Sequence, residues 1–251
     1  ELIRTGLHHE QQYLELLVMD IKYNFSRNPL VPPYFAGEVP EPRVSGHATE
    51  QWLSTEPQLV TTGTDEDSEF SFDNERPAHK NWLPGHSLRG TLITNREYLE
   101  FMEAGGYDDC LLWLSDGFDY LQRGRISGPE YWRRSDDGSY QEFQLTGLHP
   151  LDMEAPVQHV SYYEADAFAR WAGYRLPFEA EWEQTCRQTP EESGHFLESG
   201  ALLPRPQRGT YDLLGNLWEW TRTAYHAYPG YKMPKGSIGE YNAKFMAGAM
   251  V

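Results

Sequence analysis

The stretch 157–183 restricts the fold of this chain more than any other part. It begins with a run of strand character, and Ser161 and Glu164 then form a Ser-x-x-Glu capping box that predicts a helix over 162–172. After a Gly-containing turn, Pro177 opens a second helix whose first turn is acidic. A strand, two helices and a turn in so short a span predict a fold of short elements.

Composition extends this expectation to the rest of the chain. The 251 residues include 22 Gly and 17 Pro, which predicts many turns and little regular structure. Aromatic residues make up 14%, with 8 Trp and 16 Tyr, and they can fill a core without long aliphatic runs. The length allows one large domain, or one domain and part of another.

The charge and the cysteines narrow the class of protein. A net charge of −17 argues against a nucleic-acid partner and against binding to an anionic membrane surface. The two cysteines, Cys110 and Cys186, lie far apart and form no CxxC pair, so neither a disulfide framework nor a zinc–thiolate site is indicated. No run of ~18 apolar residues could span a bilayer. We therefore predict a cytoplasmic protein with small-molecule substrates, whose oligomeric state the sequence leaves unknown.

Changes in pattern divide the chain into three segments. Over 1–27, apolar residues recur at helical spacing, and Asn28-Pro29 ends the helix. Residues 28–58 are rich in Pro, Glu, Gly and Ser without a sustained period, so they are predicted to be a connector between domains. Short strands, turns and short helices are expected over 59–251, which forms the main domain.

Local patterns within the main domain predict few regular elements. A strand is expected over 59–63, where it ends at a Gly, and a helix is expected to begin at a Thr94 or Asn95 cap. Residues 105–152 are rich in Gly and aromatic side chains and are expected to be irregular. Because the chain begins inside a helical pattern and 244–251 looks like a strand entered and then cut, we expect it to be part of a longer protein.

Several blocks in this domain resemble the formylglycine-generating-enzyme and sulfatase-modifying-factor superfamily. The resemblance implies an α+β fold of C-type-lectin-like type with sparse secondary structure, in which most Trp, Gly and Pro residues of the blocks build the fold. The blocks are Phe-Asp-Asn-Glu-Arg-Pro-x-His (72–79), Thr-Asn-x-Glu-Tyr (94–98), Pro-Val-x-x-Val-Ser (156–161), Trp-Ala-Gly-x-Arg-Leu-Pro (171–177), Glu-Ala-Glu-Trp-Glu (179–183) and Gly-Asn-x-Trp-Glu-Trp (215–220).

The helix at the start of the chain carries the candidate chemistry. Residues three and four apart share one helix face, so His9, Gln12 and Tyr13 point the same way. A neutral imidazole is a good ligand for iron, copper or zinc, and two ligands at i and i+4 can hold one metal ion. A third ligand would have to come from another helix, as in metal-binding bundles.

This helix, over 6–17 and 20–30, resembles the end of the DinB-like four-helix domain of ergothioneine-type sulfoxide synthases. Those enzymes join such a domain to a formylglycine-generating-enzyme-like domain in the order seen here, so the resemblance implies that 1–27 is the last part of the helical domain. Further blocks favour this subfamily: 112–117, 147–152, 196–200 and 239–246.

The resemblance implies a reaction and its cofactor. Fe(II) and O₂ would join the sulfur of cysteine or gamma-glutamylcysteine to the imidazole of hercynine, the trimethylated betaine of histidine, and the product would be a sulfoxide. A selenoneine or ovothiol-type synthase of the same fold is the alternative. A formylglycine-generating activity is disfavoured, because its paired active-site cysteines are not evident.

The family pattern on this helix is His-x-x-x-His-x-Glu, and here it has one departure. His9 and Glu15 occupy the first and last positions, but Tyr13 replaces the second His. Three interpretations stay open. Tyr13 is a ligand in a variant iron site, or the site uses His9 with a more N-terminal His and water or with His8, or the protein binds little iron and is a pseudoenzyme. Gln12 occupies the position that orients the histidine-derived substrate in the family.

Two further site assignments rest on the same resemblance. A tyrosine serves as proton donor in the family, and Tyr241 is favoured over Tyr107, Tyr162 and Tyr163 because of its place in the Gly-Glu-Tyr-Asn block. The segment 212–219 resembles a calcium loop, and an empty structural turn is the alternative. In that loop Asp212 and Glu219 would bind Ca²⁺ through side-chain oxygens. Gly215 and Leu217 would bind it through backbone carbonyls.

Overall fold

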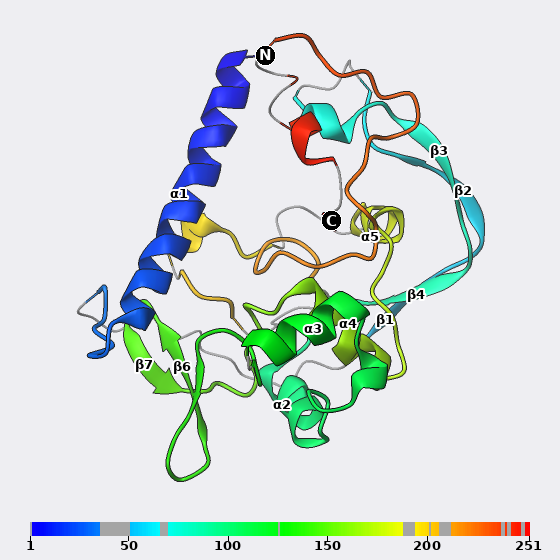
Figure 1. Cartoon of the computed structure of the whole chain (residues 1–251). Coiled ribbons are helices and arrows are strands. Elements are labelled where there is room, and N and C mark those ends of the chain that lie inside the picture. Colours follow the sequence, from blue (N-terminus) through cyan, green and yellow to red (C-terminus); the bar gives the residue numbers. More distant parts are fainter. Residues whose placement is uncertain are drawn as a thin grey trace.

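The long N-terminal helix stands at one edge of an irregular module that holds all other elements (Figure 1). The helix α1 spans Leu2–Arg27, as the helical spacing predicted. This computed structural model describes residues 2–35, 51–65, 70–124, 126–187, 194–200, 202–205, 212–236, 239, 242–246 and 249–251.

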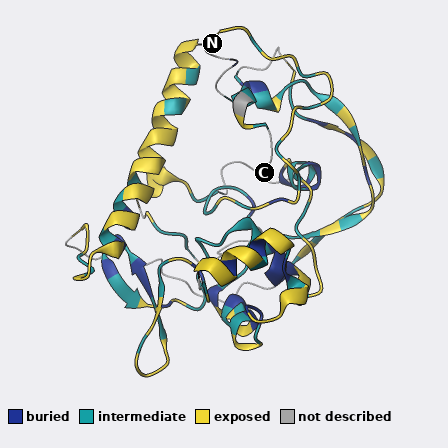
Figure 2. Ribbon diagram, viewed as in Figure 1, coloured by how far each residue is buried: buried dark blue, intermediate teal, exposed yellow. Residues whose placement is uncertain are grey.

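Most of α1 is exposed along its length (Figure 2). The apolar residues that predicted the helix include Ile3, Leu7, Leu14 and Leu17, and their exposed fractions range from 56% to 81%. Lys22 and Ser26 are the buried residues of this helix, so its last turns make the closest packing against the module. No helix in the described part of the chain has both the length and the hydrophobicity that a bilayer-spanning segment needs.

Among the described residues, the strands of the module form three small antiparallel sheets. In the first, β1 (Trp52–Thr55) pairs with β4 (His86–Arg89), and in the second, β2 (Gln58–Thr62) pairs with β3 (His79–Leu83). In the third, β6 (Tyr140–Gln144) lies between β5 (Trp132–Arg134) and β7 (Gly147–Pro150). The strand predicted over 59–63 is thus confirmed as β2.

In the described part of the chain, four short helices accompany the sheets: α2 (Asn95–Glu103), α3 (Ser115–Gly124), α4 (Tyr162–Trp171) and α5 (Glu179–Cys186). Both predicted caps are confirmed, because Thr94 and Ser161 accept hydrogen bonds from the backbone N–H groups of Glu97 and Glu164. Single turns of 3₁₀ helix are η1 (Asp73–Glu75), η2 (Cys110–Leu112), η4 (Leu197–Ser199) and η5 (Ala243–Phe245).

The structure corrects four local expectations. Residues 105–152 are not irregular, since they contain α3 and the sheet of β5, β6 and β7, and the span 28–58 contains β1. The strand expected before α4 is wrong, because the backbone there forms only an isolated bridge between Pro156 and Thr94. Within the described residues of 244–251, the expected strand is reduced to a bridge between Met250 and Ala224. Bridges form at these places because loops, rather than extended neighbouring strands, supply the partners.

Aromatic side chains fill the main core, as the composition predicted. Tyr98 and Phe101 of α2 are at most 1% exposed, and the ring of Tyr98 stacks on Phe168 of α4 at 5.5 Å between centroids. Tyr107 and Trp113 close the same cluster. A smaller cluster of Val60, Leu83 and Ala180 joins β2 and β3 to α5. Large rings therefore replace long aliphatic runs in holding short elements together.

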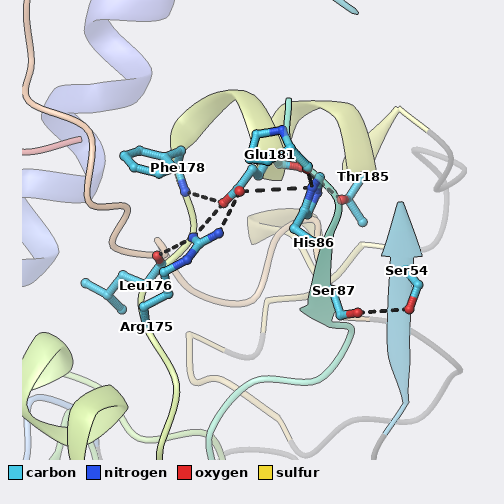
Figure 3. Close-up of polar contacts among 9 residues, drawn as sticks. Ser54, His86, Ser87, Arg175, Leu176, Phe178, Glu181 and Thr185 are labelled. Atoms are coloured by element: carbon cyan, nitrogen blue, oxygen red, sulfur yellow. Dashed lines mark hydrogen bonds and ion pairs between the residues drawn. The ribbon is translucent and has the colours of Figure 1, made fainter. Parts of the chain in front are cut away.

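A buried carboxylate fixes the start of α5 (Figure 3). Glu181 is 1% exposed, and it accepts two hydrogen bonds from the Arg175 guanidinium at 2.8 and 2.7 Å and one from the Phe178 backbone N–H at 2.8 Å. Burial works to raise the pKa of Glu181, but these hydrogen bonds outweigh it, so its pKa lies below the ordinary value. His86 of β4 lies 4.0 Å from the same carboxylate, which ties α5 to the first sheet.

Candidate active site

One stripe of α1 faces the module and contacts it at three levels. His8 stacks on Phe70 at 4.4 Å between ring centroids, and the Glu15 carboxylate accepts a hydrogen bond from the indole N–H of Trp218 at 2.6 Å. Lys22 donates to His159 at 2.8 Å. These three positions are seven residues apart, which keeps them on one side of a helix. The whole of α1, from its first turns to its last, is therefore held against the module.

The predicted iron-binding residues lie beside this stripe. His9 and Tyr13 bring their rings to 4.4 Å between centroids, and Tyr13 is 57% exposed. Gln12, three residues after His9 and next to Tyr13, is also exposed. The structure thus brings His9, Gln12 and Tyr13 to one region of the helix surface, as their spacing predicted.

His8 and His9 have different surroundings although they are adjacent in sequence. The His8 ring packs against Phe70 and meets Phe72 edge-on, and its Nδ1 lies 3.3 Å from the Gln11 side-chain oxygen. Among the residues that the structure describes, no three His, Cys, Asp or Glu side chains converge closely enough to hold a metal ion. His9 and Tyr13 therefore lie side by side on the helix, and the described residues place no group of three His, Cys, Asp or Glu side chains there.

The last turns of α1 are anchored by a buried charged cluster. Lys22 is 7% exposed, its Nζ lies 3.8 Å from a Glu142 oxygen, and it sits over the Tyr131 ring at 4.6 Å. Burial lowers the pKa of Lys22, and Glu142 opposes the shift. Burial and the neighbouring Lys22 lower the pKa of His159 to about 3, so this imidazole is neutral and accepts the hydrogen bond from Lys22.

The contact between Glu15 and Trp218 is one that sequence reasoning missed. The two residues are 203 positions apart, and the family resemblance implied that the Trp218 block builds the fold. In the structure Trp218 is 88% exposed, whereas Trp113 of the core is 6% exposed. The only sequence signal was the Glu of the His-x-x-x-His-x-Glu pattern, and it gave no indication of its partner.

The predicted calcium loop brings its two acidic side chains close together. The Asp212 carboxylate accepts a hydrogen bond from the Asn216 amide at 2.8 Å, and burial raises the pKa of Asp212. Although Glu219 as a residue is only half-buried, enclosure of its carboxyl raises its pKa to about 8; the indole of Trp182 opposes that shift and Asp212 adds to it. Burial therefore disfavours the charged form of both carboxyls.

The backbone of this loop is tightly turned. Gly215 and Asn216 have φ of 74° and 59°, in the left-handed region, and the Leu217 N–H donates to the Gly215 carbonyl at 2.7 Å. Gly215 and Leu217 lie in the same short segment as the two carboxylates, and the Gly215 carbonyl already accepts a hydrogen bond within the turn. The calcium site stays a prediction.

The tyrosines expected as proton donors have different surroundings. Tyr241 lies outside the described residues. Tyr107 is 8% exposed, and its hydroxyl donates a hydrogen bond to Glu164 at 2.7 Å within the aromatic core. This hydroxyl therefore has a structural role. Tyr162 and Tyr163 begin α4, and Tyr162 meets the Trp220 ring edge-on at 6.0 Å.

Comparisons with known proteins place these features in context. A family model of the sulfatase-modifying factor enzyme 1-like domain matches residues 41–208. The hercynine oxygenase of Mycobacterium tuberculosis is 32% identical over 189 residues, which are 66% of this chain and 44% of that protein. The hercynine oxygenase of Mycolicibacterium thermoresistibile is 33% identical over 189 residues, covering 66% and 42%.

A more distant relative has a different name. The formylglycine-generating enzyme of Bos taurus is 26% identical over 227 residues, which are 71% of this chain and 60% of that protein. This chain spans less than half the length of the hercynine oxygenases that it matches.

Proposed function

The chain belongs to the sulfatase-modifying factor enzyme 1-like domain family, and we propose that it is an oxygenase of ergothioneine biosynthesis that acts on hercynine. The reaction would be an Fe(II)- and O₂-dependent sulfoxide synthesis that joins hercynine to cysteine or gamma-glutamylcysteine. One structural observation carries this proposal beyond the similarity. The helix with His9, Gln12 and Tyr13 lies against the module in which the family match over residues 41–208 falls, and contacts near both of its ends hold it there.

The donor chemistry supports iron at the first turns of α1. His9 and Tyr13 would hold the ion, together with a donor from outside the described residues, and the bound iron would supply the oxidising chemistry. Gln12 would orient the substrate imidazole, because an amide offers both a donor and an acceptor to the ring edge. Tyr241 would supply the proton in the reaction. Ca²⁺ at Asp212 and Glu219 would stabilise the loop that carries Trp218.

The alternative activity of this family fits the cysteines poorly. A formylglycine-generating enzyme uses paired cysteines, but here Cys110 is exposed and Cys186 is buried. Burial raises the pKa of Cys186 to about 12, and Glu219 adds to the shift, so this thiol is a poor nucleophile. Reduced, unpaired cysteines agree with the predicted cytoplasmic location, which stays a prediction.

Metal analysis of protein purified anaerobically with Fe(II) tests the iron site. We expect close to one equivalent of iron in the wild type and far less in His9→Ala. His8→Ala is the matched control, and it should retain the metal because His8 packs on Phe70. Iron far below one equivalent in the wild type, or full retention in His9→Ala, would contradict the proposal and favour a pseudoenzyme.

Turnover identifies the substrates. We expect oxygen uptake with hercynine plus cysteine or gamma-glutamylcysteine, and a sulfoxide product in the mass spectrum. Uptake that requires a selenosugar would indicate a selenoneine synthase. Direct coupling of histidine to cysteine would indicate an ovothiol-type enzyme of the same fold.

A further inference from the structure

The exposure of Trp218 differs from that of its neighbour in the same motif. Trp218 is 88% exposed, whereas Trp220 is 38% exposed, meets the Tyr162 ring and donates its N–H to the Val160 carbonyl at 3.0 Å. A large aromatic side chain gains much from burial, and the Trp218 ring instead lies at the surface. The hydrogen bond to Glu15 fixes the position of the Trp218 indole and leaves its faces open.

The pair of Trp218 and Glu15 has the chemistry that recognises a quaternary ammonium ion. Such an ion has no N–H to donate, so it is bound by aromatic faces and by negative charge. Tryptophan is the strongest of the aromatic residues in this role. Here an open indole and a carboxylate lie in direct contact, 2.6 Å apart at the indole N–H.

The pair also lies at a suitable place on α1. Gln12 and Glu15 are three residues apart on neighbouring parts of one helix surface, which separates them by about 4.5 Å along the axis. A histidine betaine has an imidazole at one end and a trimethylammonium group at the other. A substrate whose imidazole faces Gln12 has Glu15 within reach of its cationic end.

Building on the proposed function, we propose that Trp218 and Glu15 form the subsite for the trimethylammonium group of hercynine. The indole face would contact the methyl groups, and the carboxylate would supply the opposite charge. This subsite would make the enzyme select the trimethylated substrate over histidine. One substrate molecule would then contact both α1, through Glu15, and the loop of the module, through Trp218.

Steady-state kinetics of Trp218→Ala test this subsite. Loss of one cation–π contact should raise the KM for hercynine by about 3- to 30-fold, and Trp218→Phe should retain part of the affinity. The KM for the thiol donor should stay unchanged. Trp82→Ala is the matched control, because Trp82 on β3 is also a largely exposed tryptophan, at 62%.

The variant Glu15→Gln distinguishes binding of the trimethylammonium group from a purely structural contact between α1 and the Trp218 loop. Glutamine keeps an oxygen that can accept the Trp218 hydrogen bond but removes the negative charge, so hercynine binding should weaken in this variant too. If Glu15→Gln binds hercynine as tightly as the wild type, the subsite is overturned and the pair is a structural clamp. An equal rise of the KM values for hercynine and for the thiol donor in Trp218→Ala would lead to the same conclusion.

A binding experiment tests the subsite independently of the proposed reaction. Tetramethylammonium should bind to the iron-free wild type in a calorimetric titration, and more weakly to Trp218→Ala. If the wild type fails to turn over hercynine yet shows this difference, the proposed function fails while the subsite stands. If hercynine is turned over and neither its KM nor tetramethylammonium binding depends on Trp218, the subsite fails while the function stands.

Discussion

At the scale of single residues, Tyr13 is the departure that decides the metal chemistry. A neutral imidazole suits Fe(II) better than a phenol does, so Tyr13→His should raise the affinity for Fe(II). Competition with a chelator under anaerobic conditions would measure the affinity of each variant for Fe(II). Tyr23→His is the control, since Tyr23 is 48% exposed on the same helix and lies three turns away. A fall in iron affinity in Tyr13→His would contradict this ranking and show that the Tyr13 phenol is the better ligand in this site.

Residues also mark the limit of what the sequence could predict about the site. The grouping of His9, Gln12 and Tyr13 follows from helical spacing alone, because all three lie within a little more than one turn. The grouping of Asp212 with Glu219 follows from their closeness in one loop. The contact of Glu15 with Trp218 could not be predicted, since it depends on how α1 docks on a loop 203 positions away.

At the scale of elements, side-chain caps define where the short helices begin. Ser161→Ala should lower the free energy of unfolding by about 1 kcal/mol, because the Glu164 N–H loses its acceptor at the start of α4. Urea unfolding would show a lower midpoint with an unchanged slope. Ser115→Ala at the exposed start of α3 is the control and should change stability by less than about 0.5 kcal/mol. Equal losses in both variants would contradict a specific role for the cap.

The same elements show why some local structure was predicted and some was not. The helices α2 and α4 have capping boxes at Thr94 and Ser161, which are readable signals. By contrast, β5, β6 and β7 are three to five residues long, too short for an alternating pattern to emerge. The ten-residue helix α3 contains two glycines, which weakens its helical signal. Tertiary packing, not local propensity, forms these elements.

At the scale of the whole molecule, the contact of Lys22 with His159 makes the docking of α1 sensitive to acid. The groups that face this contact are Glu142 on β6 and Tyr131 before β5, and Glu130 pairs with Arg27 nearby. Protonation of His159 would remove the acceptor for Lys22 and place two cations 2.8 Å apart. The end of α1 should therefore detach more readily as the pH falls.

The direction of this effect follows from the lowered pKa of His159. In the unfolded chain His159 would take up a proton near pH 6.5, but in the folded protein its pKa is about 3. Between these values the unfolded state binds more protons, so stability falls as the pH is lowered, by at most about 1.4 kcal/mol per pH unit for one group. The protection factors of the amides in the last turns of α1, which are corrected for the intrinsic pH dependence of exchange, should fall between pH 7 and pH 5. His159→Gln keeps an acceptor without this titration and should reduce that fall, whereas His226→Gln, at an exposed histidine, should not. An identical pH response in the wild type and His159→Gln would assign the acid sensitivity to other groups.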